Sequence, residues 1–421
     1  MRTRVVILGA GFGGLELSSR LSAELADQVE VTLIDQSDSF IFGFSKLDVM
    51  FARRTMDEVR IPYRDITKPG VTFRQEQVRS IDPGRKRVVT NAGVYDADVL
   101  VVALGADLAP WATPGLEECG HEFYSPEGAA RVRDVLAAFA GGNVVIAVLG
   151  GFFKCPPAPY ETAVMLHDYL ARRGVRDATA IHLVTPMPKP IPISDETSDA
   201  LTGLLDERDI RHSHACWVDR LDPAAKVAHL KDGRELPFDL FLAVPVHRAP
   251  PVVVQSGLTE DGWIPVDPAT FATRFPDVYA VGDVTSAPVP RAGVIAEGEA
   301  ATVADVLIAR IAGGPPPAPY PGEGICYIEM GDDTIGTVDV NFLSGPAPTA
   351  LFTPPSAEAA DDKRRFAAVR RDRWFGPGPR ASRPTARLDG AGHESQLATS
   401  AYEDARGRPG PSPGGSRGQA L

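Results

Sequence analysis

The hydrophobic pattern near the N-terminus predicts a strand, a helix and a second strand in close succession. Residues 5–8, Val-Val-Ile-Leu, form a short run rich in β-branched side chains, which is typical of a strand buried on both faces. Glycines follow, and leucines then recur on roughly one side of a helix expected over about residues 13–26. A second strand over residues 29–34 ends at Asp35. This order predicts a parallel sheet of the α/β class.

The same alternation of strands and helices continues down the chain. Further strands are expected at residues 99–104, 144–149, 180–184 and 278–281, and further helices over 161–173 and about 293–312. The last helix stops at Gly313-Gly314, which three prolines follow. We therefore expect two Rossmann-like dinucleotide-binding domains. The first is discontinuous, over residues 1–106 and 236–314, and the second spans residues 107–235.

The C-terminal part of the chain has a different pattern of hydrophobic, charged and Gly or Pro residues. Short strand patterns at 326–330 and 337–342 and a charged helical pattern over 361–374 predict a small C-terminal domain, residues 315–375. From residue 376 onward, 15 of 46 residues are Gly or Pro and no Phe or Trp occurs. Such a segment buries too little apolar surface to offset its ordering entropy, so residues 376–421 are expected to be a disordered tail.

Composition and charge narrow the classes of function. The chain carries 43 basic and 55 acidic side chains, a net charge of −12, which opposes a nucleic-acid partner because such binding requires a basic surface. No run of about 18 apolar residues predicts a transmembrane helix, and the first strand begins too early to leave room for a signal peptide. We expect a cytoplasmic protein, in which four cysteines are more often catalytic, buried or metal-bound than crosslinked.

A glycine-rich turn joins the first strand to the first helix. Gly9, Gly11 and Gly14 form a G-x-G-x-x-G motif, and Asp35 follows at the end of the second strand. Gly9 permits the tight turn, Gly11 lets a pyrophosphate approach the backbone, and Gly14 allows close packing of helix on strand. The carboxylate of Asp35 is suited to accept hydrogen bonds from ribose hydroxyls. The turn therefore predicts a dinucleotide site.

Two downstream segments indicate which dinucleotide binds. Residues 278–283 resemble the second flavin fingerprint of the two-dinucleotide-domain flavoproteins, which include the disulfide reductases. The resemblance implies that Asp283 binds the ribityl chain of FAD and that Gly282, in the same fingerprint, also belongs to the cofactor site. The helix from Gly293 would direct its positive end at the flavin, and the strand ending at Gly105 resembles the family's short loop motif beside the flavin. We expect FAD as the cofactor.

The second domain lacks the glycine pattern that would bind NADH. Residues 150–161 keep two glycines but add Phe152, Phe153 and prolines, which would crowd a pyrophosphate and remove amide donors. NADH is therefore an improbable electron donor. Cys155 instead precedes the helix, where the helix end and Lys154 are expected to favour its thiolate. Glu161 is a candidate proton acceptor or donor for a thiol, although a packed cysteine and a solvated glutamate are the plainer interpretation.

The segment KCPPAPYE, residues 154–161, resembles the active-site segment of sulfide:quinone oxidoreductases and of the flavin subunit of flavocytochrome c sulfide dehydrogenase. The resemblance covers about residues 4–375. It implies two redox cysteines beside the flavin, matching Cys155 and Cys326, and an acidic residue matching Glu161. A third cysteine occurs upstream in many quinone-linked members, and whether Cys119 takes that part stays open.

The resemblance also implies a reaction. Sulfide attacks a Cys155–Cys326 disulfide and leaves a persulfide on one cysteine, after which electrons pass to FAD and then to a quinone. Three alternatives remain: a sulfide dehydrogenase that donates to a cytochrome or other protein, an enzyme like type II NADH dehydrogenases, and a non-enzymatic, flavin-bearing scaffold for a partner. No metal is expected, because His212 and His214 lack further ligands at metal spacing. Cys216 is expected to be structural.

The basic and aromatic helix predicted over residues 361–375 has two interpretations. Phe366, Val369 and Phe375 could share one face, which suits peripheral contact with the inner face of the cell membrane, as in quinone-linked relatives. Alternatively, the helix packs on the protein body and only its arginines are solvated. The sequence favours neither.

Overall fold

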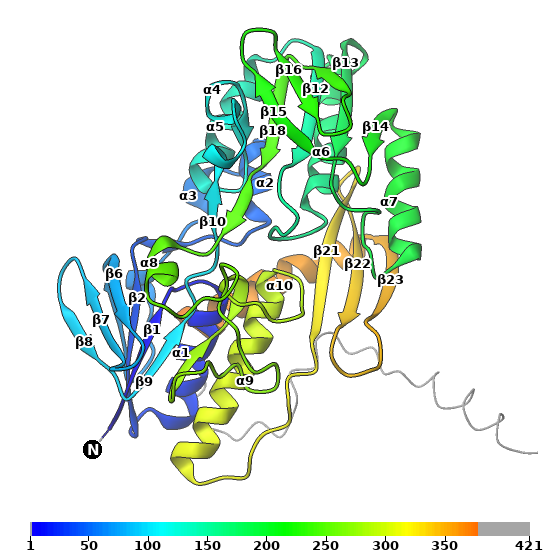
Figure 1. The fold of residues 1–421 in the computed structure, drawn as a ribbon. Helices are drawn as coiled ribbons and strands as arrows, with labels where there is room; N and C mark the ends of the chain where they lie inside the picture. The colour runs from blue at the N-terminus through cyan, green and yellow to red at the C-terminus, as the bar shows by residue number, and fades with distance from the viewer. Residues whose placement is uncertain (1, 378–421) are drawn as a thin grey trace, which may run out of the picture. The chain divides into compact units, whose positions relative to one another are not determined.

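The computed structural model describes residues 2–377, and Figure 1 shows the arrangement of their elements. The first parallel sheet has the strand order β20-β9-β1-β2-β5. Its strands are β1 (Thr3–Leu8), β2 (Val29–Asp35), β5 (Val71–Gln75), β9 (Val99–Val102) and β20 (Val278–Ala280). Helices α1 (Phe12–Leu25) and α9 (Gly293–Ala312) pack against each other beside this sheet. Buried Val, Ile and Leu side chains fill its central strands, as expected for a sheet covered on both faces.

A second parallel sheet has the order β11-β18-β12-β13-β14. Its strands are β11 (His121–Glu122), β12 (Gly142–Val148), β13 (Thr179–Val184), β14 (Ile210–Ser213) and β18 (Leu240–Val244). The helices of this part are α5 (Pro126–Ala138), α6 (Ala158–Arg172) and α7 (Asp195–Glu207). The expected α/β class with two Rossmann-like sheets is confirmed.

The pairing of β18 differs from the expected domain boundary at residue 236. This strand pairs with β12 in the second sheet, whereas its residues were expected to belong to the first domain. Two short strands, β10 (Asp107–Ala109) and β19 (Val246–Arg248), then pair with each other where the chain leaves the first sheet and returns to it. We therefore propose that the second domain extends through β18 and that the chain crosses back at β19.

Smaller elements surround the two sheets. Two antiparallel three-stranded sheets consist of β6 (Val78–Asp82), β7 (Arg87–Thr90) and β8 (Val94–Asp96), and of β15 (Val218–Asp222), β16 (Val227–Leu230) and β17 (Glu235–Pro237). The short elements are β3 (Ser39–Phe40), β4 (Ile61–Pro62), α2 (Ser45–Met50), α3 (Met56–Val59), α4 (Leu116–Cys119) and α8 (Pro251–Gln255).

The C-terminal part forms an antiparallel sheet followed by a helix. Strands β21 (Glu323–Gly331), β22 (Thr334–Asn341) and β23 (Thr349–Ser356) pair in sequence order, and α10 (Ala357–Phe375) follows. Strand β21 lies against α6, so the C-terminal sheet contacts the second domain. The expected tail, residues 376–421, lies outside the described residues except for its first two.

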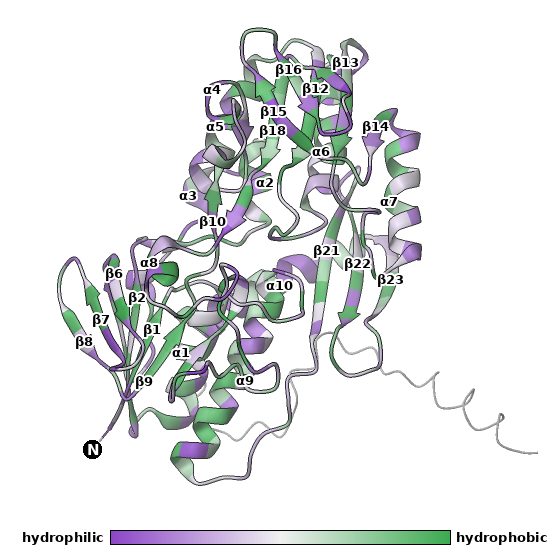
Figure 2. Ribbon diagram, in the orientation of Figure 1, coloured by the Kyte–Doolittle hydropathy of each residue, from purple (hydrophilic) through white to green (hydrophobic). Residues whose placement is uncertain are grey.

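Helix α10 packs on the protein body. Its aromatic side chains belong to the core of the first domain, with Phe366, Trp374 and Phe375 only 8%, 1% and 5% exposed, whereas Val369 is 46% exposed. Helix α10 has more hydrophilic residues along its length than α9, as the hydropathy colouring shows (Figure 2). Phe366 and Phe375 therefore do not form an exposed face with Val369. The ring of Phe366 packs on Phe42 and Phe44, and that of Phe375 stacks on Tyr63. Among the described residues, no helix is both long and apolar enough to cross a membrane.

Candidate active site

The glycine-rich turn after β1 has the geometry that its motif predicts. Gly9 has a φ of 98°, and a Cβ there would lie 2.3 Å from the carbonyl oxygen of Ala103. At Gly14 a Cβ would lie 1.9 Å from the carbonyl oxygen of Gly9, so this glycine lets α1 approach the strand. A Cβ at Gly11 would meet nothing within 4 Å. The turn is therefore closed toward the sheet and open at Gly11.

Asp35 is held in place at the end of β2. One carboxylate oxygen accepts from the backbone N–H of Ala10 at 2.8 Å, and the other accepts from that of Ser37 at 2.8 Å. The side chain also lines the cavity in front of the glycine turn. Its remaining lone pairs are available to accept hydrogen bonds from a ribose in this cavity.

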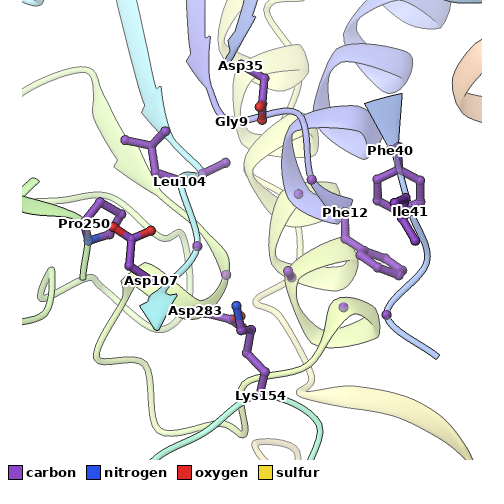
Figure 3. A pocket seen from close by; sticks show the side chains of 18 of the residues that line it. Gly9, Phe12, Asp35, Phe40, Ile41, Leu104, Asp107, Lys154, Pro250 and Asp283 are labelled. Carbon is purple, nitrogen blue, oxygen red and sulfur yellow. The ribbon is translucent and has the colours of Figure 1, made fainter. Parts of the chain in front are cut away.

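A cavity of about 690 Å³ joins the separate motifs (Figure 3). The site residues expected for the cofactor that line it are Gly9, Gly11, Asp35, Gly105, Gly282, Asp283 and Gly293. Gly14 is absent from this lining because it serves the packing of helix on strand. The volume falls within the range of about 300–1,000 Å³ typical of cofactor sites. The open backbone at Gly11 and the carboxyl group of Asp283 fit the pyrophosphate and the ribityl chain of FAD.

A buried carboxyl group accepts a hydrogen bond from the backbone of the second flavin fingerprint. The backbone N–H of Gly282 donates to the side chain of Glu299, which lies in α9 and is almost completely buried. Burial raises the pKa of Glu299 to about 8. Burial also raises the pKa of Asp283, against the opposing effect of Lys154, which extends toward it in Figure 3. Glu299 was missed by the sequence analysis, since its helical position carries no recognisable motif.

Cys155 and Cys326 pack against the same hydrophobic core. Cys155 precedes α6, and its backbone N–H donates to the carbonyl of Arg291 at 2.9 Å. Cys326 lies in β21. Glu161 connects the two elements, because its carboxylate in α6 accepts from the backbone N–H of Glu329 in β21 at 3.0 Å. The structure thus brings together Cys155, Cys326 and Glu161, and the cavity is lined by Cys155 and Glu161. All four cysteines are free thiols here.

Comparison with known proteins identifies the family. Residues 3–304 match the sequence profile described as "Pyridine nucleotide-disulphide oxidoreductase". The chain belongs to this family. Like other pyridine nucleotide-disulphide oxidoreductases of this kind, it is an FAD-dependent oxidoreductase. The expected FAD cofactor is thereby confirmed, and so is the resemblance to the two-dinucleotide-domain flavoproteins.

Named relatives include quinone-linked enzymes. The chain is 26% identical over 361 residues to a sulfide-quinone reductase of Aquifex aeolicus, which covers 79% of this chain and 82% of the relative. A type II NADH:quinone oxidoreductase of Staphylococcus haemolyticus is 25% identical over 245 residues, 55% of this chain and 61% of the relative. The solved sulfide:quinone oxidoreductase of Aquifex aeolicus has the same fold, with a TM-score of 0.79, 24% identity and coverage of 89% and 92%.

Electrostatics at the cysteines of this oxidoreductase differ from the expectation. Burial raises the pKa of the Cys155 thiol well above its usual value, and the neighbouring Glu161 and Cys326 add to the effect. Burial likewise raises the pKa of Cys326 to about 12. The ammonium group of Lys154 does not offset this, because it donates to the carbonyl of Ala106 at 2.9 Å. The predicted thiolate preference was therefore wrong, since desolvation outweighs the helix end.

Glu161 is the acid–base candidate that the electrostatics favour. Its side chain is 2% exposed, and burial raises its pKa to about 7, against the effects of Lys363 and of its hydrogen bond from Glu329. Lys363 in turn pairs with the Glu329 carboxylate at 2.7 Å. A carboxyl group with this pKa exchanges protons near neutral pH, where a general acid or base is most effective.

The other sequence candidates lie elsewhere. Cys119 and Cys216 belong to a different hydrophobic cluster, and the thiol of Cys119 donates to the carbonyl of Gly115 at 3.2 Å. His212 contacts Asp206 at 3.1 Å, and His214 contacts the hydroxyl of Tyr160 at 3.1 Å. Within residues 2–377, no group of three or more His, Cys, Asp or Glu side chains could hold a metal ion.

Two further cavity residues were missed by the sequence analysis. Lys46, in α2, and Tyr124, before α5, both line the cavity, and the Lys46 ammonium donates to the backbone carbonyl of Tyr124. Burial lowers the pKa of Lys46 to about 8 and raises the pKa of Tyr124, and the nearby Cys155 acts on each in the upward direction. Neither position lies in a motif, because the contacts join segments far apart in the sequence.

Proposed function

We propose that this FAD-dependent oxidoreductase oxidises sulfide through a Cys155–Cys326 redox pair and passes the electrons through FAD to a quinone. The observation that carries the proposal is that Cys155 and Cys326 pack against one hydrophobic core, beside the two elements that Glu161 joins. Cys155 and Glu161 line the cavity that both flavin fingerprints line. Bound FAD supplies a two-electron acceptor that can later discharge to another molecule.

In the proposed reaction the two cysteines carry the sulfur and Glu161 takes the proton. When the pair is oxidised, hydrosulfide attacks one sulfur of the Cys155–Cys326 disulfide, which forms a persulfide on that cysteine and releases the other as a thiolate. The proton of the attacking hydrosulfide passes to Glu161, whose buried carboxyl group exchanges protons near neutral pH. A second sulfur nucleophile takes the outer sulfur of the persulfide and leaves both cysteines reduced. The pair would return to the disulfide by giving two electrons to an acceptor, which is the chemistry that bound FAD would supply.

The named relatives support a quinone as acceptor. Both the sulfide-quinone reductase of Aquifex aeolicus and the NADH:quinone oxidoreductase of Staphylococcus haemolyticus carry quinone in their names. These two relatives differ in the electron donor, so the donor must be argued from this chain. Cys155 and Cys326 favour sulfide over NADH.

The loop after β12 supports the same choice. A Cβ at Gly151 would lie 3.4 Å from the indole of Trp217, and Phe153 is buried beside it. Strand β13 is followed by Thr185 rather than by an acid suited to a ribose. These features oppose the alternative of an NADH-oxidising enzyme, since little room remains for a second pyrophosphate. The alternative of a sulfide dehydrogenase that donates to a cytochrome has the same electron donor and differs from the proposed function only in the electron acceptor, so these features do not oppose it.

Reduction of a soluble quinone tests the proposal. We expect sulfide to drive reduction of decylubiquinone by the FAD-loaded enzyme, and NADH to drive it at least about a hundredfold more slowly. Cys155→Ser and Cys326→Ser should abolish sulfide-driven flavin reduction, because each removes one half of the redox pair. The matched controls Cys119→Ser and Cys216→Ser should retain it. Faster reduction by NADH, or full activity of Cys155→Ser, would contradict the proposal.

A further inference from the structure

Lys46 brings a positive charge to the cavity without a partner carboxylate. Its ammonium group has one hydrogen bond, to the backbone carbonyl of Tyr124. No carboxylate oxygen of residues 2–377 lies within ion-pair distance of it, and the nearby Glu122 pairs with Arg131 at 3.2 Å instead. Two N–H donors of Lys46 therefore remain for a ligand.

Tyr124 adds a second donor without a partner. The side chain is 7% exposed, and its hydroxyl has no hydrogen-bond partner among the described residues although the residue lines the cavity. A buried hydroxyl without a partner costs about 1–3 kcal/mol, so such groups in native proteins usually serve a ligand or a water. The two donors belong to neighbouring residues, since the Lys46 ammonium donates a hydrogen bond to the backbone carbonyl of Tyr124.

The charges around the two donors favour an anion. Lys46 shares the cavity with a second ammonium, that of Lys154. Burial and Lys154 lower the pKa of Lys46 to about 8, while Glu122, Cys155 and Asp283 act in the opposite direction. Two cations near one another in a partly buried cavity repel, and an anion between them and Cys155 removes that repulsion.

We propose that the Lys46 ammonium and the Tyr124 hydroxyl bind a small sulfur monoanion, hydrosulfide or an organic thiolate, and hold it beside Cys155. This inference rests on the proposed function, because it names the binding site of the nucleophile in that reaction. The oxidised isoalloxazine ring is neutral, and the pyrophosphate of FAD is expected at the glycine turn after β1. An anion site beside Cys155 that exists before reduction therefore serves the substrate. A site for the reduced flavin would become useful only after electron transfer.

Alkylation of Cys155 tests the site without relying on turnover. In a Cys326→Ser background with oxidised FAD, Cys155 is a free thiol, and its modification by iodoacetate and by iodoacetamide can be followed by mass spectrometry of its peptide. The anionic reagent requires the anion site and the neutral one does not. Their rate ratio cancels any change in the pKa of Cys155, since both react with the same thiolate.

We expect Lys46→Met to lower the iodoacetate-to-iodoacetamide rate ratio about tenfold, the loss typical of one charge-assisted hydrogen bond. Tyr124→Phe should lower it about threefold, and Lys46→Arg should restore most of it. The control Lys189→Met, at a surface lysine paired with Asp195, should leave the ratio unchanged. If neither Lys46→Met nor Tyr124→Phe changes the rate ratio, the proposed anion site is wrong. This conclusion holds even if the substitutions shift the reduction potential of the flavin.

The same variants separate this inference from the proposed function. If sulfide reduces the flavin, Lys46→Met should raise the sulfide concentration for half-maximal reduction about tenfold. If sulfide does not reduce the flavin of the native enzyme, the proposed function falls while the alkylation ratio still reports on the anion site. An unchanged half-saturation in an enzyme that does use sulfide overturns the assignment of hydrosulfide to these two donors.

Discussion

Individual residues determine whether the cofactor fits. The turn after β1 tolerates no side chain at Gly14, because a Cβ there would overlap the carbonyl oxygen of Gly9. Gly203, in the middle of α7, has open space instead, with nothing within 4 Å of its Cβ position. The same substitution at the two glycines therefore has opposite consequences.

Gly14→Ala should yield protein with less than about a tenth of the normal FAD content, since α1 must move away from the strand and its first turn with it. Flavin absorbance per polypeptide after purification measures this. Gly203→Ala should keep its full FAD content and be equally or more stable, by up to about 1 kcal/mol, because alanine favours a helix. Normal flavin content of Gly14→Ala would show that the packing is not required.

Glu161 should govern how the reaction responds to pH. As its pKa is about 7, the carboxylate that accepts a proton prevails above pH 7 and disappears below it. The ratio of the flavin-reduction rates of the native enzyme and Glu161→Gln should therefore rise about tenfold per pH unit up to pH 7 and level off above. Taking the ratio cancels the ionisation of sulfide itself. A ratio that stays constant from pH 5 to 9 would exclude Glu161 as the base.

At the scale of elements, α10 is fixed to the first domain by a buried ion network. Glu16 in α1 is almost fully buried and accepts from the Trp374 indole at 2.7 Å and from Arg373 at 2.8 Å. Glu297 in α9 pairs with Arg370 at 2.6 Å. The helix therefore rests on the same two helices, α1 and α9, whose N-termini face the cofactor cavity.

Removing the buried charge should loosen α10. Glu16→Leu leaves Arg373 without one of its buried partners, which is expected to cost about 3–5 kcal/mol of unfolding free energy in urea titrations. Trypsin should then cleave within α10 before the rest of the chain. Arg364→Gln, which breaks an exposed pair with Asp361, is the matched control and should cost under about 0.5 kcal/mol. Equal effects of the two substitutions would contradict this account.

Local pattern was sufficient to predict the central strands of both parallel sheets and the helices α1, α6, α9 and α10, but not the short strands or the partner of each strand. The helix expected from about residue 293 to 312 is α9, and both β-α-β units are present. The proposed shift of the boundary from residue 236 to the end of β18 could not be predicted, because an apolar run looks alike in either sheet and only the pairing with β12 assigns it. Lys46 and Tyr124 escaped notice for a similar reason, since their contact joins separate segments.

At the scale of the whole molecule, the site residues come from three parts of the chain. The first domain supplies the flavin fingerprints, the second supplies Cys155 and Glu161, and the C-terminal sheet supplies Cys326. A disulfide between Cys155 and Cys326 would consequently tie the second domain to the C-terminal sheet. The oxidation state of the pair should then change global stability.

We expect the air-oxidised enzyme to be about 2–4 kcal/mol more stable than the enzyme reduced with a phosphine, because the crosslink closes a long loop in the unfolded chain. Urea unfolding of the two forms measures the difference. Cys326→Ser should eliminate the dependence on reductant, whereas Cys119→Ser should keep it. A native enzyme whose stability ignores the reductant would show that the two thiols do not form a crosslink.

The backbone of Cys155 has a φ of 54°, a left-handed conformation that a side chain disfavours by roughly 1–2 kcal/mol. Glycine adopts it freely, so Cys155→Gly should give an inert protein that resists denaturation better than Cys155→Ala does. The native protein would then be less stable than it could be, because it keeps a side chain with a sulfur atom at a position that favours glycine. A substitution selected only for stability at this position would therefore remove the proposed redox cysteine.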